Sequence, residues 1–233
     1  MRTVELNTVT KYYGQSKILN ELSFSLERGD VVGLIGPNGG GKTTLIKIIA
    51  GQLPFDSGTG TTCGVTLGRG RAPFCGLMLD NSPFIDDMTG KQNLKALCGI
   101  RKKATSSDIC TTLHETGLDP ALKHRVHTYS QGMRQRLAFA QAIVENPTLL
   151  LFDEPLNGLD PTGILDVRSL IRRFAKQGTS ILFSSHILAE LPEVCNRVCA
   201  LVNGKIVELS PREFSDYHAL EDTYRRITGY CDE

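Results

Sequence analysis

The sequence lacks a strong net charge and a long hydrophobic run. Its 233 residues carry a formal net charge of +1, with 22% charged and 40% hydrophobic residues. Such a balance creates no field that would attract nucleic acid or an anionic membrane surface, so we expect no nucleic-acid partner. The longest apolar segment, Pro147–Phe152, is far shorter than the roughly 20 residues that cross a bilayer. If the protein works at a membrane, another chain must supply the spans.

Patterns that mark secretion, metal binding or fibrous structure are also missing. The first residues, Met1–Val9, mix charged and apolar side chains, so we expect no signal peptide. The seven cysteines include no CxxC pair, and only Cys195 and Cys199 lie close together. We therefore expect reduced thiols in a cytoplasmic protein, and regard a metal site at this pair as the weaker alternative. No internal repeat or sustained heptad pattern is found.

The hydrophobic pattern predicts an antiparallel sheet followed by a parallel α/β unit. Apolar residues alternate in Val4–Val9 and Ile18–Leu26, and Glu27–Asp30 is typical of a turn. A short apolar strand, Val31–Ile35, then leads through a glycine-rich loop into a helix over Thr43–Ala50 that Gly51 would end.

The middle of the chain changes to a helical pattern. A turn-rich link over Pro54–Gly60 precedes short strands at Thr61–Leu67 and Cys75–Leu79. From Thr89 to about His127 the pattern is helical, with an N-cap among residues 106–108 and a stop at Gly117. We interpret residues 81–145 as a helical subdomain inserted into the α/β core.

The rest of the chain returns to alternating helices and strands. Ser130 is expected to cap a helix, and the wholly apolar Leu149–Phe152 is typical of a central parallel strand. The remaining expected elements are helices at Gln131–Glu145 and Pro161–Lys176, a strand at Thr179–Phe183, and a hairpin of Val198–Val202 and Lys205–Leu209 around Asn203-Gly204. Residues 1–210 would form one domain, with a helical tail over 211–233.

One glycine-rich loop fits the pattern G-x-x-x-x-G-K-[ST] at every fixed position. Glycines let backbone N–H groups curl around phosphate oxygens, and the helix that follows points its positive end at them. Lys42 would reach the β- and γ-phosphates of ATP, and the Thr43 hydroxyl would bind Mg²⁺. The expected nucleotide-binding residues of this P-loop are Gly36, Pro37, Asn38, Gly39, Gly40, Gly41, Lys42, Thr43 and Thr44.

Two carboxylates end the strand Leu149–Phe152. Ligands of an open parallel sheet bind at the carboxyl ends of its strands, which would bring Asp153 and Glu154 to the phosphate loop. We expect Asp153 to organise Mg²⁺ and Glu154 to face the water that attacks the γ-phosphate. Alone, such a pair is often only a solvated loop. The phosphate loop in the same chain favours the catalytic interpretation.

Further motifs give the chain a specific family resemblance. Tyr129-Ser130-Gln131-Gly132-Met133 resembles the LSGGQ loop of ATP-binding-cassette (ABC) nucleotide-binding subunits, with two relaxed positions. Asn157-Gly158-Leu159-Asp160 is similar to the D-loop of that family, and Ser185-His186 to its switch histidine. Tyr13, before Gly14, matches the aromatic residue that stacks on adenine, although Tyr12 lies beside it. The resemblance runs from about Val4 to Glu208.

The resemblance implies a P-loop NTPase core that works as a head-to-tail dimer with ATP between the subunits. Ser130, Gln131 and Gly132 would bind the γ-phosphate of ATP held by the other subunit, and His186 would contact the same phosphate from its own side. Asp160 would communicate across the dimer. Hydrolysis would then drive a separate transmembrane permease, with this subunit held peripherally at the inner face of the cell membrane.

One position departs from the family pattern. A Gln is usual at the end of the strand that leads into the helical subdomain, whereas Asp80 follows Leu77-Met78-Leu79 here. With an acidic residue at this position, the chain resembles the subgroup that exports, or confers immunity to, peptide antibiotics. We hypothesise that Asp80 binds Mg²⁺, since hard cations prefer carboxylate oxygen; the alternative is that it only caps the loop.

Several alternatives stay open. We expect export, although import and either a homodimer or a heterodimer remain compatible with the sequence. A soluble mechanochemical ATPase acting on ribosomes or DNA is the second hypothesis; such relatives usually carry two cassettes or long coiled coils. A regulatory ATP sensor that hydrolyses poorly is disfavoured because Lys42, Asp153, Glu154 and His186 are all present.

Overall fold

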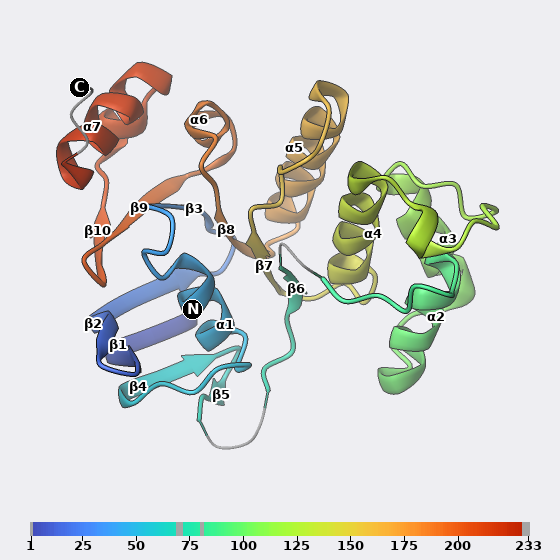
Figure 1. The fold of residues 1–233 in the computed structure, drawn as a ribbon, viewed down its shortest axis with the longest axis horizontal. Helices are drawn as coiled ribbons and strands as arrows, with labels where there is room; N and C mark the ends of the chain where they lie inside the picture. The colour runs from blue at the N-terminus through green and yellow to red at the C-terminus, as the bar shows by residue number, and fades with distance from the viewer. Residues whose placement is uncertain (1, 69–71, 80–81, 230–233) are drawn as a thin grey trace.

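A six-stranded sheet forms the centre of the molecule (Figure 1). The computed structural model describes residues 2–68, 72–79 and 82–229. Strands lie in the order β10-β9-β3-β8-β7-β6, and all pair in parallel except β10, which is antiparallel to β9. Their bounds are β3 Val31–Ile35, β6 Gly76–Met78, β7 Leu149–Asp153, β8 Ser180–Ser184, β9 Arg197–Val202 and β10 Lys205–Glu208.

The central strands are apolar throughout because both of their faces are covered. In β7, Leu149 and Leu151 point into one hydrophobic core, whereas Leu150 and Phe152 point into the other. The predicted central strand at Leu149–Phe152 and the predicted hairpin around Asn203-Gly204 are both present. The fold class expected from the sequence, a mostly parallel α/β core with an antiparallel sheet, is confirmed.

A second, antiparallel sheet covers one face of the first, in the order β2-β1-β4-β5. Its strands are β1 Arg2–Tyr13, β2 Ser16–Glu27, β4 Ser57–Thr62 and β5 Val65–Thr66. The short strand expected at Thr61–Leu67 is present only in part, because the chain turns at residues 63–64 between β4 and β5, and β4 begins inside the segment interpreted as a link. Gly58 permits this pairing, since a Cβ there would lie 2.6 Å from the carbonyl oxygen of Thr8.

Helices fill the space around the sheets. Helix α1 (Lys42–Ile49) packs between the two sheets, with Leu45, Ile46 and Ile48 fully buried. The opposite face of the central sheet is covered by α5 (Pro161–Lys176), α6 (Leu191–Val194) and α7 (Tyr217–Thr228). Three short 3-10 helices occupy Val126–Thr128, Leu188–Glu190 and Pro211–Phe214. Within the described ranges, no helix has the length and apolarity needed to cross a membrane.

A separate helical unit lies to one side of the core in Figure 1. It contains α2 (Gly90–Arg101), α3 (Ser106–Glu115) and α4 (Gln131–Ile143), which share a hydrophobic core of their own. The predicted N-cap at residues 106–108 is wrong: Thr105 caps α3, and its hydroxyl accepts a hydrogen bond from the N–H of Asp108 at 3.2 Å. Helix α4 contributes to both this core and the central one, so it joins the unit to the sheet.

Candidate functional site

The glycine-rich loop between β3 and α1 has a backbone that only glycine tolerates. Gly36 has φ of 151°, and a Cβ there would lie 2.5 Å from the carbonyl oxygen of Leu201. Gly41 has φ of 101° directly before α1, and a Cβ there would lie 2.9 Å from Cγ2 of Ile18. The loop therefore keeps its backbone exposed on the inner side, next to the N-terminus of α1, where N–H groups are available to an anion.

Lys42 is almost buried at the start of α1, with 7% of its surface exposed. Its Nζ donates to the carbonyl oxygens of Gly36 at 2.8 Å and Pro37 at 3.1 Å. Burial lowers the pKa of Lys42, and the nearby carboxylates of Glu154 and Asp153 oppose that shift. The ammonium group thus lies within the curve of the loop, paired only with carbonyl oxygens that a phosphate could replace.

The carboxylate of Asp153, at the carboxyl end of β7, accepts hydrogen bonds from two hydroxyl groups. Thr43 Oγ1 donates to its Oδ2 at 2.6 Å, and Ser184 Oγ donates to its Oδ1 at 2.7 Å. The pairing of β7 with β8 sets Asp153 opposite Ser184, which brings the second hydroxyl into place. These are hard oxygen donors, the chemistry that Mg²⁺ prefers, and Thr43 and Asp153 supply them from two sides of one cavity.

Glu154 adopts a backbone conformation unusual for its residue type, with φ of 53°. Its N–H donates to Ser184 Oγ at 2.9 Å, and its carbonyl oxygen accepts from Gln135 Nε2 at 3.1 Å. Its side-chain Oε2 contacts His186 Nδ1 at 2.8 Å and accepts from the His186 N–H at 3.3 Å. These bonds compensate the local strain and fix the direction of the carboxylate.

These groups open into one cavity of about 290 Å³. Its lining includes Tyr13 and the two acidic residues Asp153 and Glu154. The remaining lining residues are Ile18, Asn38, Gly39, Gly41, Lys42, Thr43, Thr44 and Asn157. The sequence motifs predicted most of this set, but they did not single out Ile18 or Asn157 as site residues. They also missed Ser184, which bonds the Asp153 carboxylate and the Glu154 N–H, and Gln135, which bonds the Glu154 carbonyl oxygen.

The signature segment lies apart from this cavity. Ser130 caps α4 by accepting a hydrogen bond from the Met133 N–H at 3.3 Å. Gln131 and Gly132 pack against Gly158 of the D-loop segment. Among the described residues that line the cavity, none comes from residues 130–132 or from position 160. Position 80, where Asp80 is expected to contact Mg²⁺, lies outside the described residues.

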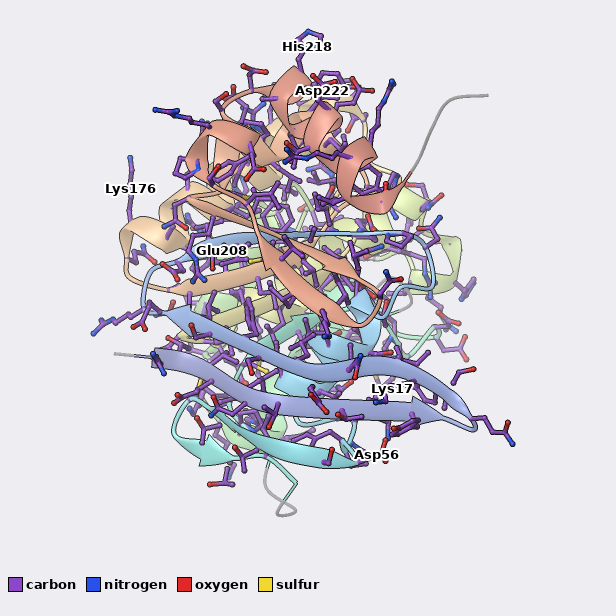
Figure 2. The ribbon with its side chains drawn as sticks, turned by 90° about the vertical axis from the view of Figure 1, so that its left-hand side faces the viewer. Lys17, Asp56, Lys176, Glu208, His218 and Asp222 are labelled. Atoms are coloured by element: carbon purple, nitrogen blue, oxygen red, sulfur yellow. The ribbon has the colours of Figure 1, made fainter. Side chains whose placement is uncertain are left out.

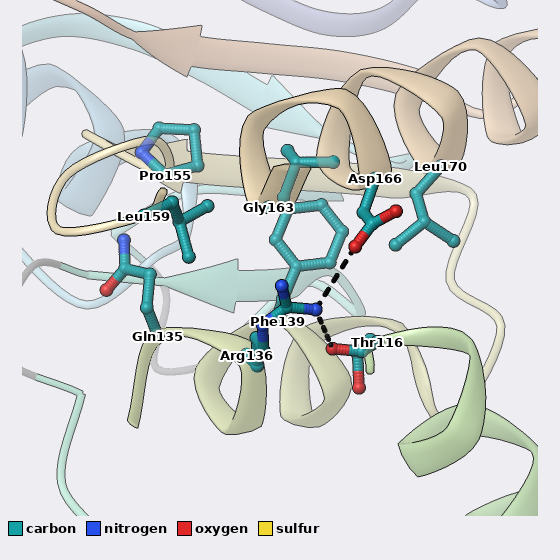
Figure 3. A pocket seen from close by; sticks show the side chains of 10 residues that line it. Thr116, Gln135, Arg136, Phe139, Pro155, Leu159, Gly163, Asp166 and Leu170 are labelled. Atoms are coloured by element: carbon teal, nitrogen blue, oxygen red, sulfur yellow. Dashed lines mark hydrogen bonds and ion pairs between the residues drawn. The ribbon is translucent and has the colours of Figure 1, made fainter. Parts of the chain in front are cut away.

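Asp160 is the N-cap of α5, and its carboxylate lies next to Arg136 of α4. Its Oδ1 accepts from the Gly163 N–H at 3.1 Å and lies 3.8 Å from Arg136 Nη2. Arg136 Nη1 donates to the carbonyl oxygen of Thr116 and to Oδ2 of Asp166, each at 3.2 Å (Figure 3). The D-loop end is therefore tied to the helical unit through one guanidinium group.

Comparisons with known proteins identify the family of the chain. The family model described as ABC transporter matches residues 19–157. An uncharacterized ABC transporter ATP-binding protein of Bacillus subtilis, YdbJ, is 40% identical over 87% of this chain and 67% of its own length. The lantibiotic transport ATP-binding protein SrtF of Streptococcus pyogenes is 33% identical over 95% of both chains.

A solved structure described as the ATP binding subunit of an ABC transporter has a similar fold. It superposes with a TM-score of 0.86 over 97% of this chain and 99% of that one, at 26% identity. The likeness therefore covers both sheets, the helical unit and the cavity between β3 and α1.

Proposed function

This chain belongs to the ABC transporter family as an ATP-binding ATPase subunit, and we propose that it closes as a head-to-tail dimer on ATP to drive a separate transmembrane permease. The observation that carries this proposal is the cavity lined by Lys42, by the hydrogen-bonded pair Thr43–Asp153 and by Glu154, whose carboxylate contacts His186. Phosphoryl transfer needs such positioning and charge stabilisation more than covalent chemistry.

ATP binding would use the phosphate loop and the ring of Tyr13. The backbone N–H groups of residues 38–44 would surround the phosphates, and Lys42 would exchange its carbonyl partners for phosphate oxygens. Tyr13 lines the cavity and would stack on adenine. We favour Tyr13 over Tyr12 for this role, because Tyr12 is not among the residues that line the cavity.

Mg²⁺ fits the oxygen donors at the carboxyl end of β7. Thr43 and Asp153 would hold the ion, which supplies charge neutralisation for the phosphate oxygens when bound. Asp80 is a further proposed contact on the basis of its sequence position alone.

Hydrolysis would use Glu154 as the general base toward water. The hydrogen bond from His186 holds the Glu154 carboxylate, and Gln135 and Ser184 hold its backbone, so its direction is fixed before substrate arrives. When ATP is bound, His186 contacts the γ-phosphate and leaves the carboxylate free to take a proton.

The second half of the site would come from another subunit. Ser130, Gln131 and Gly132 lie at the N-terminus of α4, away from the cavity of their own chain, so they are available to the γ-phosphate held by a partner. Asp160, through Arg136, would relay closure to the helical unit. The partner is a second copy or a related subunit.

The permease would be a separate membrane protein, with this subunit peripheral at the cytoplasmic face. We propose export of a peptide antibiotic or similar cargo, supported by the likeness to SrtF and by the acidic residue at position 80. A soluble mechanochemical ATPase is the alternative, and the balanced charge of +1 disfavours it for nucleic-acid partners.

Glu154→Gln tests the catalytic part of this proposal. We expect ATP hydrolysis to fall at least about 100-fold while ATP binding is retained, because only the proton acceptor is lost. Light scattering should then show a dimer that forms with Mg-ATP and persists. Glu221→Gln on α7 is the matched control and should hydrolyse ATP as the wild type does. Normal turnover by Glu154→Gln would refute the assignment.

A further inference from the structure

Tyr13 is the part of the nucleotide cavity with the weakest visible support. It is the last residue of β1, and 51% of its surface is exposed. An exposed ring at a strand end keeps much of its freedom unless the backbone beneath it is held. On one side β2 holds this backbone, since Ser16 pairs with Tyr13. On the other side the support comes from Asp56, which lies directly before β4.

On the side of β4, Asp56 takes the place of a strand partner for the end of β1. Strand β4 begins at Ser57, which pairs with Thr10, so the β1–β4 ladder stops before Tyr12, whereas the β1–β2 ladder continues to Tyr13. The Asp56 N–H donates to the Thr10 carbonyl oxygen at 2.9 Å, and its carboxylate Oδ2 accepts from the Tyr12 N–H at 2.6 Å. That bond lowers the pKa of Asp56, so the carboxylate is ionised at neutral pH.

Lys11 joins the Asp56 carboxylate to the Tyr13 ring. The residue is buried, with 8% of its surface exposed, although it carries an ammonium group. Its Nζ lies 3.4 Å from Asp56 Oδ1 and 5.9 Å from the centre of the Tyr13 ring. A buried ammonium needs such partners, because an unpaired charge away from water is costly.

We propose that Asp56 and Lys11 are a positioning pair that holds Tyr13 for base stacking and thereby sets affinity for the base of the nucleotide. The proposal rests on the proposed function, in which Tyr13 stacks on adenine. Figure 2 shows Asp56 at the same end of the antiparallel sheet as Lys17, whose ammonium covers Tyr12. The two tyrosines are thus held by separate cations, and only the Tyr13 ring lines the cavity.

The test separates base binding from phosphate binding. For Asp56→Ala, we expect the KM for ATP to rise about three- to tenfold, with kcat within about twofold of the wild type. Inorganic tripolyphosphate, which has no base, should inhibit with unchanged Ki. Lys11→Met should behave alike, and Asp56→Asn should raise KM less, because its amide oxygen still accepts from Tyr12. An unchanged KM, a parallel rise in KM and in the Ki of tripolyphosphate, or equal losses in Asp56→Asn and Asp56→Ala would overturn the proposal.

Two controls make the outcome specific. Asp216 also accepts a backbone N–H, from Ala219 at 3.0 Å, but it caps α7 far along the chain, so Asp216→Ala should leave the KM unchanged. Tyr13→Leu reports on the proposed function itself. If it leaves the KM for ATP unchanged, the stacking role and the positioning role fall together. If it raises the KM while Asp56→Ala does not, only the positioning role is wrong.

Discussion

Ser184 links the Asp153 carboxylate to the backbone of Glu154. It is fully buried at the end of β8. Its hydroxyl donates to Asp153 Oδ1 at 2.7 Å and accepts from the Glu154 N–H at 2.9 Å. One side chain therefore sets both the orientation of the Mg²⁺-binding carboxylate and the strained backbone of the general base.

Ser184→Ala should reduce catalysis more than it reduces nucleotide binding. The substitution leaves an Asp153 oxygen and the Glu154 N–H without a protein partner, a loss of about 1–3 kcal/mol for a buried group. We expect kcat to fall roughly tenfold or more, and the Mg²⁺ concentration for half-maximal rate to rise. Steady-state ATPase assays across Mg²⁺ concentrations measure both.

The control for Ser184→Ala is Ser169→Ala on α5. Ser169 is exposed, and its hydroxyl donates to the Leu165 carbonyl oxygen at 2.9 Å, away from the cavity. Its loss should leave both kinetic values unchanged. Equal behaviour of the two variants would show that the Ser184 hydroxyl has no part in the site.

The sequence predicts the site residues that sit in short motifs and misses those brought in by strand pairing. Lys42, Thr43 and Asp153 occur in patterns whose spacing carries their chemistry. Ser184 is 31 residues from Asp153, and only the register of β7 with β8 brings them together. The available signal was a hydroxyl residue at the end of an apolar strand, just before Ser185-His186.

Among the elements, β4 departs most from the sequence interpretation. Its residues Ser57–Thr62 are polar and include two glycines, a composition typical of a turn. The segment is a strand because its backbone pairs with β1, with Val4 opposite Thr62. Helix α1 lies between β1 and β4 in the sequence. Such non-local pairing depends on tertiary contacts, which override local propensity.

The contact between β6 and α4 holds the helical unit against the sheet, and Gly76 makes it possible. A Cβ at Gly76 would lie 2.0 Å from the Ala142 carbonyl oxygen and 2.6 Å from Leu150 Cδ2. Gly76→Ala should therefore lower the free energy of unfolding by about 1–3 kcal/mol, as overpacked sites do. Urea unfolding followed by circular dichroism measures this change.

Gly99→Ala gives the matched control on α2. A Cβ there would meet no atom within 4 Å, and alanine favours a helix over glycine. We expect a rise of about 0.5–1 kcal/mol in the free energy of unfolding. A Gly76→Ala protein as stable as the wild type would show that β6 and α4 can separate without cost.

At the scale of the whole molecule, ion pairs and polar contacts add to the packing of α4 in linking the helical unit to the core. Arg136 joins the end of α3 to α5, as Figure 3 shows, and Arg173 of α5 forms a bidentate pair with Glu115 at 2.7 and 2.8 Å. Surface pairs of this kind contribute about 0–1 kcal/mol, so they guide the orientation of the unit more than they stabilise it. The helical pattern from Thr89 to about His127 indicated these helices in the sequence.

The central claim is that this ATPase drives a membrane permease, and one measurement tests it most directly. Tagged Glu154→Gln protein is expressed in its native cell, membranes are solubilised in mild detergent with Mg-ATP, and the co-purifying chains are quantified by mass spectrometry beside the Glu221→Gln control. We predict a polytopic membrane protein in near-equal amount. Recovery of ribosomal or DNA-associated proteins, with no membrane protein, would contradict the account and support the soluble mechanochemical alternative.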